Sequence, residues 1–185
     1  MGIEIEAKLK VDSLRDVERR LIALGAQFLA EKLQKDMYFN DPRGILAKSD
    51  RCLRLRTESV GQTKHFILTH KGVRQKDNFK KREEIEVEVA DADITEELLL
   101  ALGYERALLF EKRRRLWLFA DCLVALDELP LLGAFVEIEG PDDKKISAVQ
   151  ESIGLGHLSH VSESYARLVT EKMRELGYKK MELLL

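Results

Sequence analysis

Charged and apolar residues alternate in the first strand-like segment of the chain, and the alternation returns in most later segments that could form strands. In residues 3–9 it places Glu4, Glu6 and Lys8 on one face, because successive side chains of a strand point to opposite faces. One such strand could simply be half exposed, with its charges in water. Many strands with a charged face instead favour a closed antiparallel barrel, whose charges line the interior and whose apolar outside is covered by helices.

The balance of charges narrows the class of ligand. The 185 residues fit a single domain, 1–185, and carry 31 basic and 33 acidic side chains. This near-equality argues against a nucleic-acid partner, because surfaces that bind nucleic acids are normally basic. If the bases cluster around an anionic substrate, the acids are left to hold something positive, and metal ions are the natural candidates.

The two cysteines indicate a reducing environment. Cys52 and Cys122 show neither the spacing of a metal site nor a disulfide framework. The sequence opens directly on the first strand with no apolar signal region, and no apolar run reaches transmembrane length. We therefore expect a cytoplasmic protein without a membrane partner.

Hydrophobic periodicity predicts an α+β order of elements. Strands are expected at residues 3–9, 35–40, 52–58, 64–71, 82–89, 108–119, 123–129 and 135–139. Helices are expected at about 14–24, 94–102, 143–153 and 162–177, the last with Ser162 as its cap. Residues 45–50 and 72–81 are expected to form loops, the second of them polar, basic and mobile. The tail 178–185 is expected to fray, or to pack under the barrel or against a second subunit.

Fourteen residues fall on the charged strand faces. The acids are Glu4, Glu6, Glu84, Glu86, Asp127, Glu137 and Glu139, and the bases are Lys8, Arg54, Arg56, Lys71, Arg82, Lys112 and Arg114. Paired carboxylates suit Mg²⁺ or Mn²⁺, which prefer hard oxygen ligands and substrate phosphates. Arginine and lysine side chains suit a polyphosphate. The triplet Glu-Ile-Glu, found at 4–6, 84–86 and 137–139, further suggests that carboxylate pairs from different strands meet in one cavity.

These residues resemble those of a known family. Glu4-Ile5-Glu6-Ala7-Lys8 looks like the ExExK signature of the CYTH, or triphosphate tunnel metalloenzyme, superfamily. Five further segments fall in the family's order, at 53–56, 69–72, 82–86, 111–114 and 133–139. The match at 69–72 departs at Val73, where family members often have proline. Segments 35–39, 110–114 and 164–168 look closest to the class IV adenylate cyclase branch.

The resemblance implies an eight-stranded antiparallel tunnel and a role for each of the fourteen residues. It implies metal ligands at Glu4, Glu6, Asp127, Glu137 and Glu139. It implies substrate binding by Lys8, Arg54, Arg56, Lys71, Arg82, Lys112 and Arg114. It also implies catalytic roles for Lys8, Lys71, Glu84 and Glu86, of which the two glutamates would hold a second metal or orient arginines.

The same constellation is compatible with more than one reaction. A class IV adenylate cyclase would convert ATP to cyclic AMP and pyrophosphate, whereas an inorganic or thiamine triphosphatase would hydrolyse tripolyphosphate or thiamine triphosphate. A non-catalytic module that binds polyphosphates or nucleotides is the alternative from another class, and a purely structural role for the charges is a third. A homodimer is left open. His157 and His160 have a spacing that could hold a metal, but lack further ligands.

Overall fold

The computed structural model describes residues 2–73 and 80–185, without the side chains of residues 2–4, 47, 80 and 81. The elements are β1 (Gly2–Val11), α1 (Leu14–Ala23), β2 (Gln27–Asn40), α2 (Ile45–Lys48), β3 (Cys52–Val60), β4 (Thr63–Lys71), β5 (Lys80–Val89), α3 (Ala92–Ala101), β6 (Glu105–Phe119), β7 (Cys122–Leu129), β8 (Gly133–Glu139), α4 (Asp143–Ser152), α5 (Tyr165–Glu175) and β9 (Glu182–Leu183). The expected loop at 72–81 lies mostly outside the described residues. Among those described, no helix has the length and apolarity needed to span a membrane.

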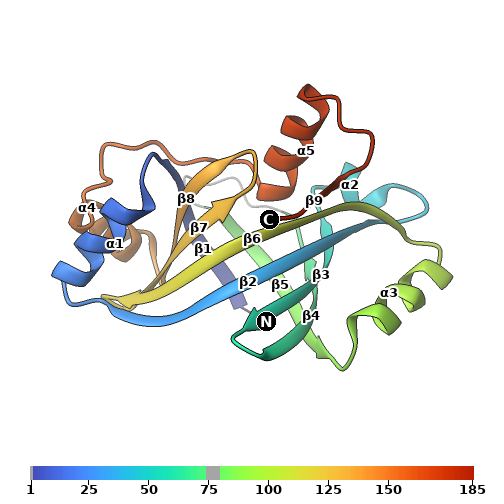
Figure 1. The fold of residues 1–185 in the computed structure, drawn as a ribbon, viewed down its shortest axis with the longest axis horizontal. Coiled ribbons are helices and arrows are strands. Elements are labelled where there is room, and N and C mark those ends of the chain that lie inside the picture. Colours follow the sequence, from blue (N-terminus) through green and yellow to red (C-terminus); the bar gives the residue numbers. More distant parts are fainter. Residues whose placement is uncertain (1, 74–79) are drawn as a thin grey trace.

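Eight of the strands form a closed antiparallel barrel, which confirms the predicted architecture. The strand order is β2-β3-β4-β5-β1-β8-β7-β6, and β6 pairs in turn with β2 along nearly its whole length. Figure 1 shows β2 and β6 running side by side across the molecule. Because each strand has two neighbours, the charged faces of all eight can surround a common interior.

Three helices cover the outer face of the barrel. α1 and α4 pack on β1, β7 and β8 at one end, where residues such as Leu21, Ile146 and Ile138 are fully buried in one apolar cluster. α3 covers β2 and β3 at the other end, where Leu99 packs on Phe39 and Leu55 (Figure 1). These contacts bury the apolar strand residues and leave the alternate, charged residues facing inward.

α5 covers a different part of the barrel. At one end of β6, β7 and β8 the inward-facing positions become apolar, as at Phe110, Leu129 and Phe135. Val169 and Met173 of α5, the helix that lies beside β8 and β9 in Figure 1, pack on these residues. The cap of this helix is Ser164, whose Oγ accepts a hydrogen bond from the backbone N–H of Arg167 at 3.3 Å, and not Ser162 as predicted. The helix begins later because the N–H of Val161 donates to the Lys8 carbonyl at 2.7 Å, which holds the preceding segment along β1.

Two local predictions were wrong, and one alternative that the sequence left open is decided by the structure. β2 begins at Gln27 and not at 35, since pairing with β6 holds its first half extended although Phe28 and Leu33 are exposed there. Residues 45–48 form the short helix α2, and Asp41 accepts a hydrogen bond from the N–H of Leu46 at 2.7 Å. The tail does not simply fray, because β9 pairs in parallel with β6 and buries Leu183 in the α5 cluster.

Candidate functional site

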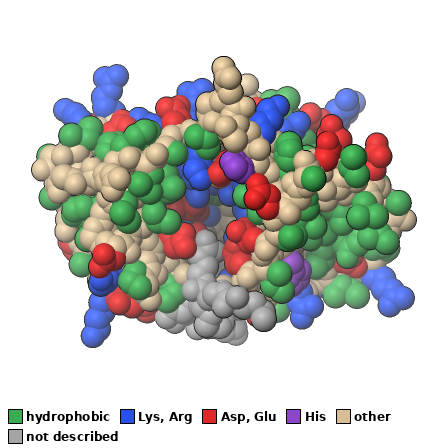
Figure 2. All heavy atoms as spheres, turned by 90° about the horizontal axis from the view of Figure 1, so that it is seen from below, with side chains coloured by type: hydrophobic (Ala, Val, Ile, Leu, Met, Phe, Trp, Pro, Cys, Tyr) green, Lys and Arg blue, Asp and Glu red, His purple; other side chains and the backbone are tan. Residues whose placement is uncertain are grey.

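A cavity of about 1110 Å³ lies inside the barrel and opens between α2 and α5. Figure 2 shows a hollow in one face of the molecule, with acidic and basic side chains around it. Twelve of the fourteen predicted residues line the cavity: Glu6, Lys8, Arg54, Arg56, Lys71, Arg82, Glu84, Glu86, Lys112, Arg114, Glu137 and Glu139. The side chain of Glu4 lies outside the described residues, and Asp127 is fully buried behind the cavity wall.

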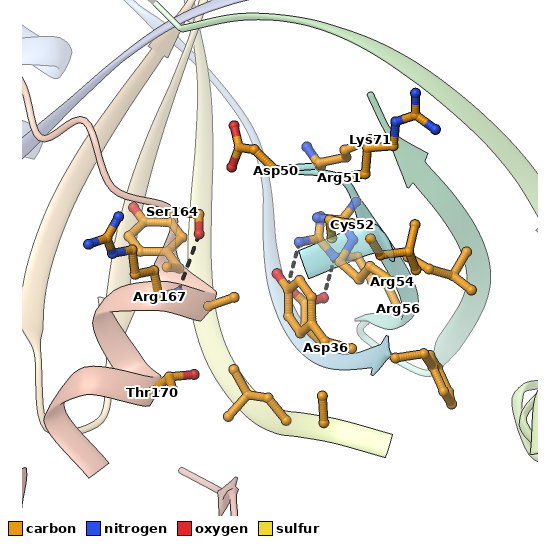
Figure 3. Close-up of a pocket in the computed structure, with 18 of the residues that line it drawn as sticks. Asp36, Asp50, Arg51, Cys52, Arg54, Arg56, Lys71, Ser164, Arg167 and Thr170 are labelled. Carbon is orange, nitrogen blue, oxygen red and sulfur yellow. Dashed lines mark hydrogen bonds and ion pairs between the residues drawn. The ribbon is translucent and has the colours of Figure 1, made fainter. Parts of the chain in front are cut away.

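On one wall, Asp36 of β2 holds Arg56 of β3. The two residues are directly opposite in register, and Asp36 accepts hydrogen bonds from Arg56 Nε at 2.6 Å and Nη2 at 2.8 Å. Burial acts to raise the pKa of Asp36, but the charge of Arg56 outweighs it and the pKa lies well below its usual range. This buried carboxylate therefore stays ionised and fixes the guanidinium plane toward the cavity (Figure 3).

Next to it, Glu86 of β5 orients Arg54. Arg54 Nη2 donates to Glu86 Oε1 at 3.3 Å and to Thr69 Oγ1 at 3.1 Å, and the Thr69 hydroxyl donates to the same carboxylate oxygen at 2.7 Å. Burial acts to lower the pKa of Arg54, yet nearby Asp36 helps to keep that pKa above its usual value. Arg54 is thus a fixed cation that remains charged.

At the mouth, two further predicted bases, Lys71 and Arg82, are also paired with acids. Lys71 forms an ion pair with Glu84, which faces it in the register of β4 and β5. Arg82 binds Asp50, with Nη2 3.1 Å from Oδ2 and a further hydrogen bond to the Asp50 carbonyl. Asp50 lies in the turn between α2 and β3 (Figure 3), so its contact with Arg82 ties this turn to β5.

On the opposite wall, Asp127 of β7 anchors two bases of β6. It accepts hydrogen bonds from Arg114 Nε at 2.7 Å and Nη2 at 2.5 Å, and from Lys112 Nζ at 3.3 Å. Burial acts to raise the pKa of Asp127, but Arg114 and Lys112 hold it below its usual value. Burial, with Arg114 beside it, lowers the pKa of Lys112 to about 8. Arg114 also forms an ion pair with Glu137.

Three described carboxylates on neighbouring strands offer oxygen ligands for a metal. Glu6 of β1 lies opposite Glu139 of β8, and Glu137 is 3.3 Å from Lys8 Nζ. Their hard oxygens suit Mg²⁺ or Mn²⁺. Within the described part of the chain, however, no three such side chains are arranged closely enough to hold a metal. A cation would have to draw Glu137 away from the bases that it now contacts.

One aromatic residue, which is not among the fourteen predicted site residues, also belongs to the site. Tyr165, the first residue of α5, lies over two of the predicted bases, with Lys8 Nζ 3.8 Å and Lys112 Nζ 4.7 Å from its ring centroid. In the sequence, Tyr165 belongs to the buried stripe expected for its helix and to segment 164–168, but not to the fourteen predicted site residues. It does pack there, but it also lines the cavity.

The end of the cavity near α2 is partly apolar. Its lining there includes Tyr38, Leu46, Leu108 and Met181, the last of which immediately precedes β9. Apolar side chains make no favourable contacts with an inorganic phosphate chain, but they do make such contacts with an aromatic or aliphatic substituent. The cavity therefore combines a charged compartment with a compartment that suits an organic group.

Two other residues, Arg113 and His160, lie outside the cavity. Arg113 is half exposed on the outer face of β6, near Glu31 and Glu128, as its alternation with Lys112 and Arg114 predicts. His160 shares a hydrogen bond of 2.9 Å with the side chain of Gln150. This contact gives the histidine a structural role at the end of α4.

Comparison with known proteins gives consistent results. The family model that describes the CYTH domain matches residues 2–165. A Methanocaldococcus jannaschii protein named putative adenylate cyclase is 33% identical over 149 residues, which are 80% of this chain and 81% of that protein.

Solved structures share the fold. A Pyrococcus horikoshii protein of 29% sequence identity superposes with a TM-score of 0.79, covering 91% of this chain and 99% of its own. A Hippeastrum protein, described as a putative adenylyl cyclase that reveals a dominant triphosphatase activity, has a TM-score of 0.71 at 18% identity. The match covers 91% of this chain and 95% of the Hippeastrum chain. At that identity the likeness is one of fold alone.

Proposed function

Because the chain belongs to the CYTH domain family, we propose that its cavity is the active site of a divalent-metal-dependent enzyme acting on a triphosphate, and that the reaction is that of a class IV adenylate cyclase. In this reaction ATP is converted to cyclic AMP and pyrophosphate. The name of the Methanocaldococcus jannaschii relative supports the proposal.

The observation that carries the proposal is the division of one cavity into two compartments. The charged compartment contains arginines and lysines, each fixed by an acidic partner, and these bind phosphate oxygens well. The partly apolar compartment next to Tyr38 and Leu108 suits a nucleoside base. A nucleoside triphosphate would occupy both, whereas tripolyphosphate would leave the second empty.

Membership of this family implies a divalent metal, and Mg²⁺ or Mn²⁺ fits the carboxylate oxygens. Glu6, Glu137 and Glu139, with Glu4, would hold the ion, and Asp127 would lie behind them. When bound, such an ion neutralises charge on the phosphates and lowers the pKa of a hydroxyl that contacts it.

The chain's own residues would orient the substrate for cyclisation. The 3′-hydroxyl oxygen of ATP forms a bond to the α-phosphorus, the bond from that phosphorus to the oxygen bridging the β-phosphate breaks, and the hydroxyl proton is released. Arg54, Arg56 and Lys112 would neutralise the departing pyrophosphate. Glu84 and Glu86 would act by orienting Lys71 and Arg54, since they contact these bases directly.

A triphosphatase on the same scaffold is the second candidate. Water would attack the terminal phosphorus of tripolyphosphate or thiamine triphosphate, and the same charged compartment would serve. The activity described for the Hippeastrum protein is consistent with this reaction on this fold. A module that binds triphosphates without turnover would need the bases and the acids that fix them, but not the carboxylates proposed to hold a metal.

The test is a phosphorus-resolved assay with Mg²⁺ or Mn²⁺, offering ATP and tripolyphosphate in parallel. We expect cyclic AMP and pyrophosphate from ATP, and their loss in Glu139→Gln. Release of orthophosphate from tripolyphosphate, with ATP intact, would overturn the cyclase and favour the triphosphatase. Binding of both compounds without turnover would indicate a binding module.

A further inference from the structure

The ring of Tyr165 contacts two lysines that come from distant strands of the barrel. Lys8 is on β1 and Lys112 on β6, with β8 and β7 between them. Their Nζ atoms lie 3.8 Å and 4.7 Å from the ring centroid, within the range of cation–π attraction. Tyr165 is therefore the point at which these two lysines converge.

The ring is held firmly in this place. Tyr165 is only 7% exposed and meets Phe135 edge to face, with the ring centroids 5.3 Å apart. It directly follows the cap residue Ser164, and the carbonyl of Glu163 accepts a hydrogen bond from Lys8 Nζ at 3.2 Å. The start of α5 thus reaches Lys8 through both its backbone and its aromatic ring.

An aromatic ring serves a phosphate-binding lysine differently from a carboxylate. Glu137 and Asp127, which contact Lys8 and Lys112 through ion pairs, bring a negative charge that opposes a bound phosphate. The face of the ring attracts an ammonium group through its quadrupole and carries no net charge. It can therefore orient both lysines without neutralising them.

Packing alone would give a simpler explanation, because Tyr165 also belongs to the apolar cluster under α5. Val169 and Met173 are more deeply buried in that cluster, at 0% exposure, and fill the same role through aliphatic contacts. An aliphatic side chain at 165 would keep apolar contacts in this cluster but lose the edge-to-face contact with Phe135, and only an aromatic one can attract the two ammonium groups. The two explanations therefore predict different outcomes for an aliphatic replacement.

We propose that Tyr165 is a positioning residue that orients Lys8 and Lys112 toward the triphosphate. The first turn of α5 would then contribute to substrate binding through these two lysines. The inference rests on the proposed triphosphate-binding function. It adds a residue from outside the barrel wall, at the last position that the family model matches.

A direct test of the contact uses nuclear magnetic resonance of the metal-free protein. Protons that lie over an aromatic face are shifted upfield, so the Cε protons of Lys8 and Lys112 should show this shift in the unaltered protein. We expect the shift to persist in Tyr165→Phe and to vanish in Tyr165→Leu. Lysine resonances at ordinary positions in the unaltered protein would overturn the inference, whether or not the protein has enzymatic activity.

The contribution to binding is measured by titration calorimetry with tripolyphosphate and without metal. We expect Tyr165→Leu to bind about tenfold more weakly than the unaltered protein, and Tyr165→Phe to recover most of the loss. Val169→Ala, a matched packing control on the same helix, should unfold more readily but keep its affinity. The inference would be overturned if Tyr165→Leu bound tripolyphosphate as tightly as the unaltered protein, or if Val169→Ala lost as much affinity as Tyr165→Leu.

The two experiments separate this inference from the proposed function. If the unaltered protein does not bind tripolyphosphate and also turns over neither ATP nor tripolyphosphate in the assay with Mg²⁺ or Mn²⁺, the proposed function fails and the positioning role fails with it. If it binds them and only the ring contact or the Tyr165→Leu effect is absent, the function stands and the role of Tyr165 is refuted.

Discussion

Asp36 and Arg56 form a two-point ion pair inside the barrel, in which both carboxylate oxygens accept hydrogen bonds from one guanidinium group. Asp36 is 1% exposed, so its charge is stabilised by this partner and not by bulk water. The pair joins β2 to β3 and aims Arg56 into the cavity.

Removing the charge of Asp36 should therefore leave Arg56 buried without its counter-charge. We expect Asp36→Asn to lower the free energy of unfolding by about 3–5 kcal/mol and to weaken triphosphate binding. Urea denaturation and calorimetry measure the two effects. Asp93→Asn, at an exposed position in the first turn of α3, should change stability by no more than about 1 kcal/mol. Equal stability of the two variants would contradict the role given to Asp36.

Lys112 should make ligand binding depend on pH. Its pKa is lowered to about 8 in the folded protein, chiefly by burial, against about 10.4 in an unfolded chain. Between these values the unfolded chain binds more protons, so this group makes folding stability rise with pH, while the folded site loses a positive charge. Metal-free affinity for tripolyphosphate should accordingly fall as pH rises through 8. A fall that persists unchanged in Lys112→Met would show that another group is responsible.

Carboxylates that hold a metal should be distinguishable from those on the outer face. We expect Glu139→Gln to weaken Mn²⁺ binding roughly tenfold or more. Even mutation of a residue that only hydrogen-bonds to a metal ligand typically lowers metal affinity by about 10–100-fold. Electron paramagnetic resonance of free Mn²⁺ gives the affinity directly. Glu128→Gln provides the control, since Glu128 is exposed on β7 next to Arg113. Similar Mn²⁺ affinities in both variants would remove Glu139 from the metal site.

The C-terminal strand should contribute measurably to the packing of α5. Leu183 is 8% exposed and contacts the cluster that contains Met173, whereas the neighbouring Leu184 is 50% exposed. We expect Leu183→Ala to lower the free energy of unfolding by about 2–3 kcal/mol, and Leu184→Ala by less than about 0.5 kcal/mol. Equal effects in chemical denaturation would show that β9 adds no specific packing.

The barrel was predictable because its signal repeats. Alternation at Glu4-Glu6-Lys8, Arg54-Arg56 and Glu137-Glu139 assigns each residue to the inner face of a strand, without knowledge of which strands are neighbours. Closure of the barrel then brings these inner faces around one cavity. The metal ligands remain predictions, because ligand geometry depends on side-chain rotations that alternation does not encode.

Asp36 and Tyr165 lie in segments 35–39 and 164–168, which resemble a branch of the family, but no local pattern indicates their contacts. Asp36 derives its importance from Arg56, 20 positions later, and a single acid in a strand does not indicate such a partner. Tyr165 fits the apolar spacing of a packed helix equally well with or without its lysine contacts. α2 and β9 are too short for periodicity to appear, and tertiary contacts with the barrel determine their conformation.

Closure of the barrel also affects how the protein acquires its site. Lys8 faces Glu137 across the β1–β8 pairing, and Gln27 at the start of β2 faces Leu118 near the end of β6. Pairings between such distant segments form slowly, typically on a scale of milliseconds to seconds, because a long loop must close before the contact stabilises it. During synthesis, β5 can pair with β1 early, but Lys8 must wait for β8 before it can meet Glu137. The complete charged cavity would therefore form late, after nearly the whole wall has been translated.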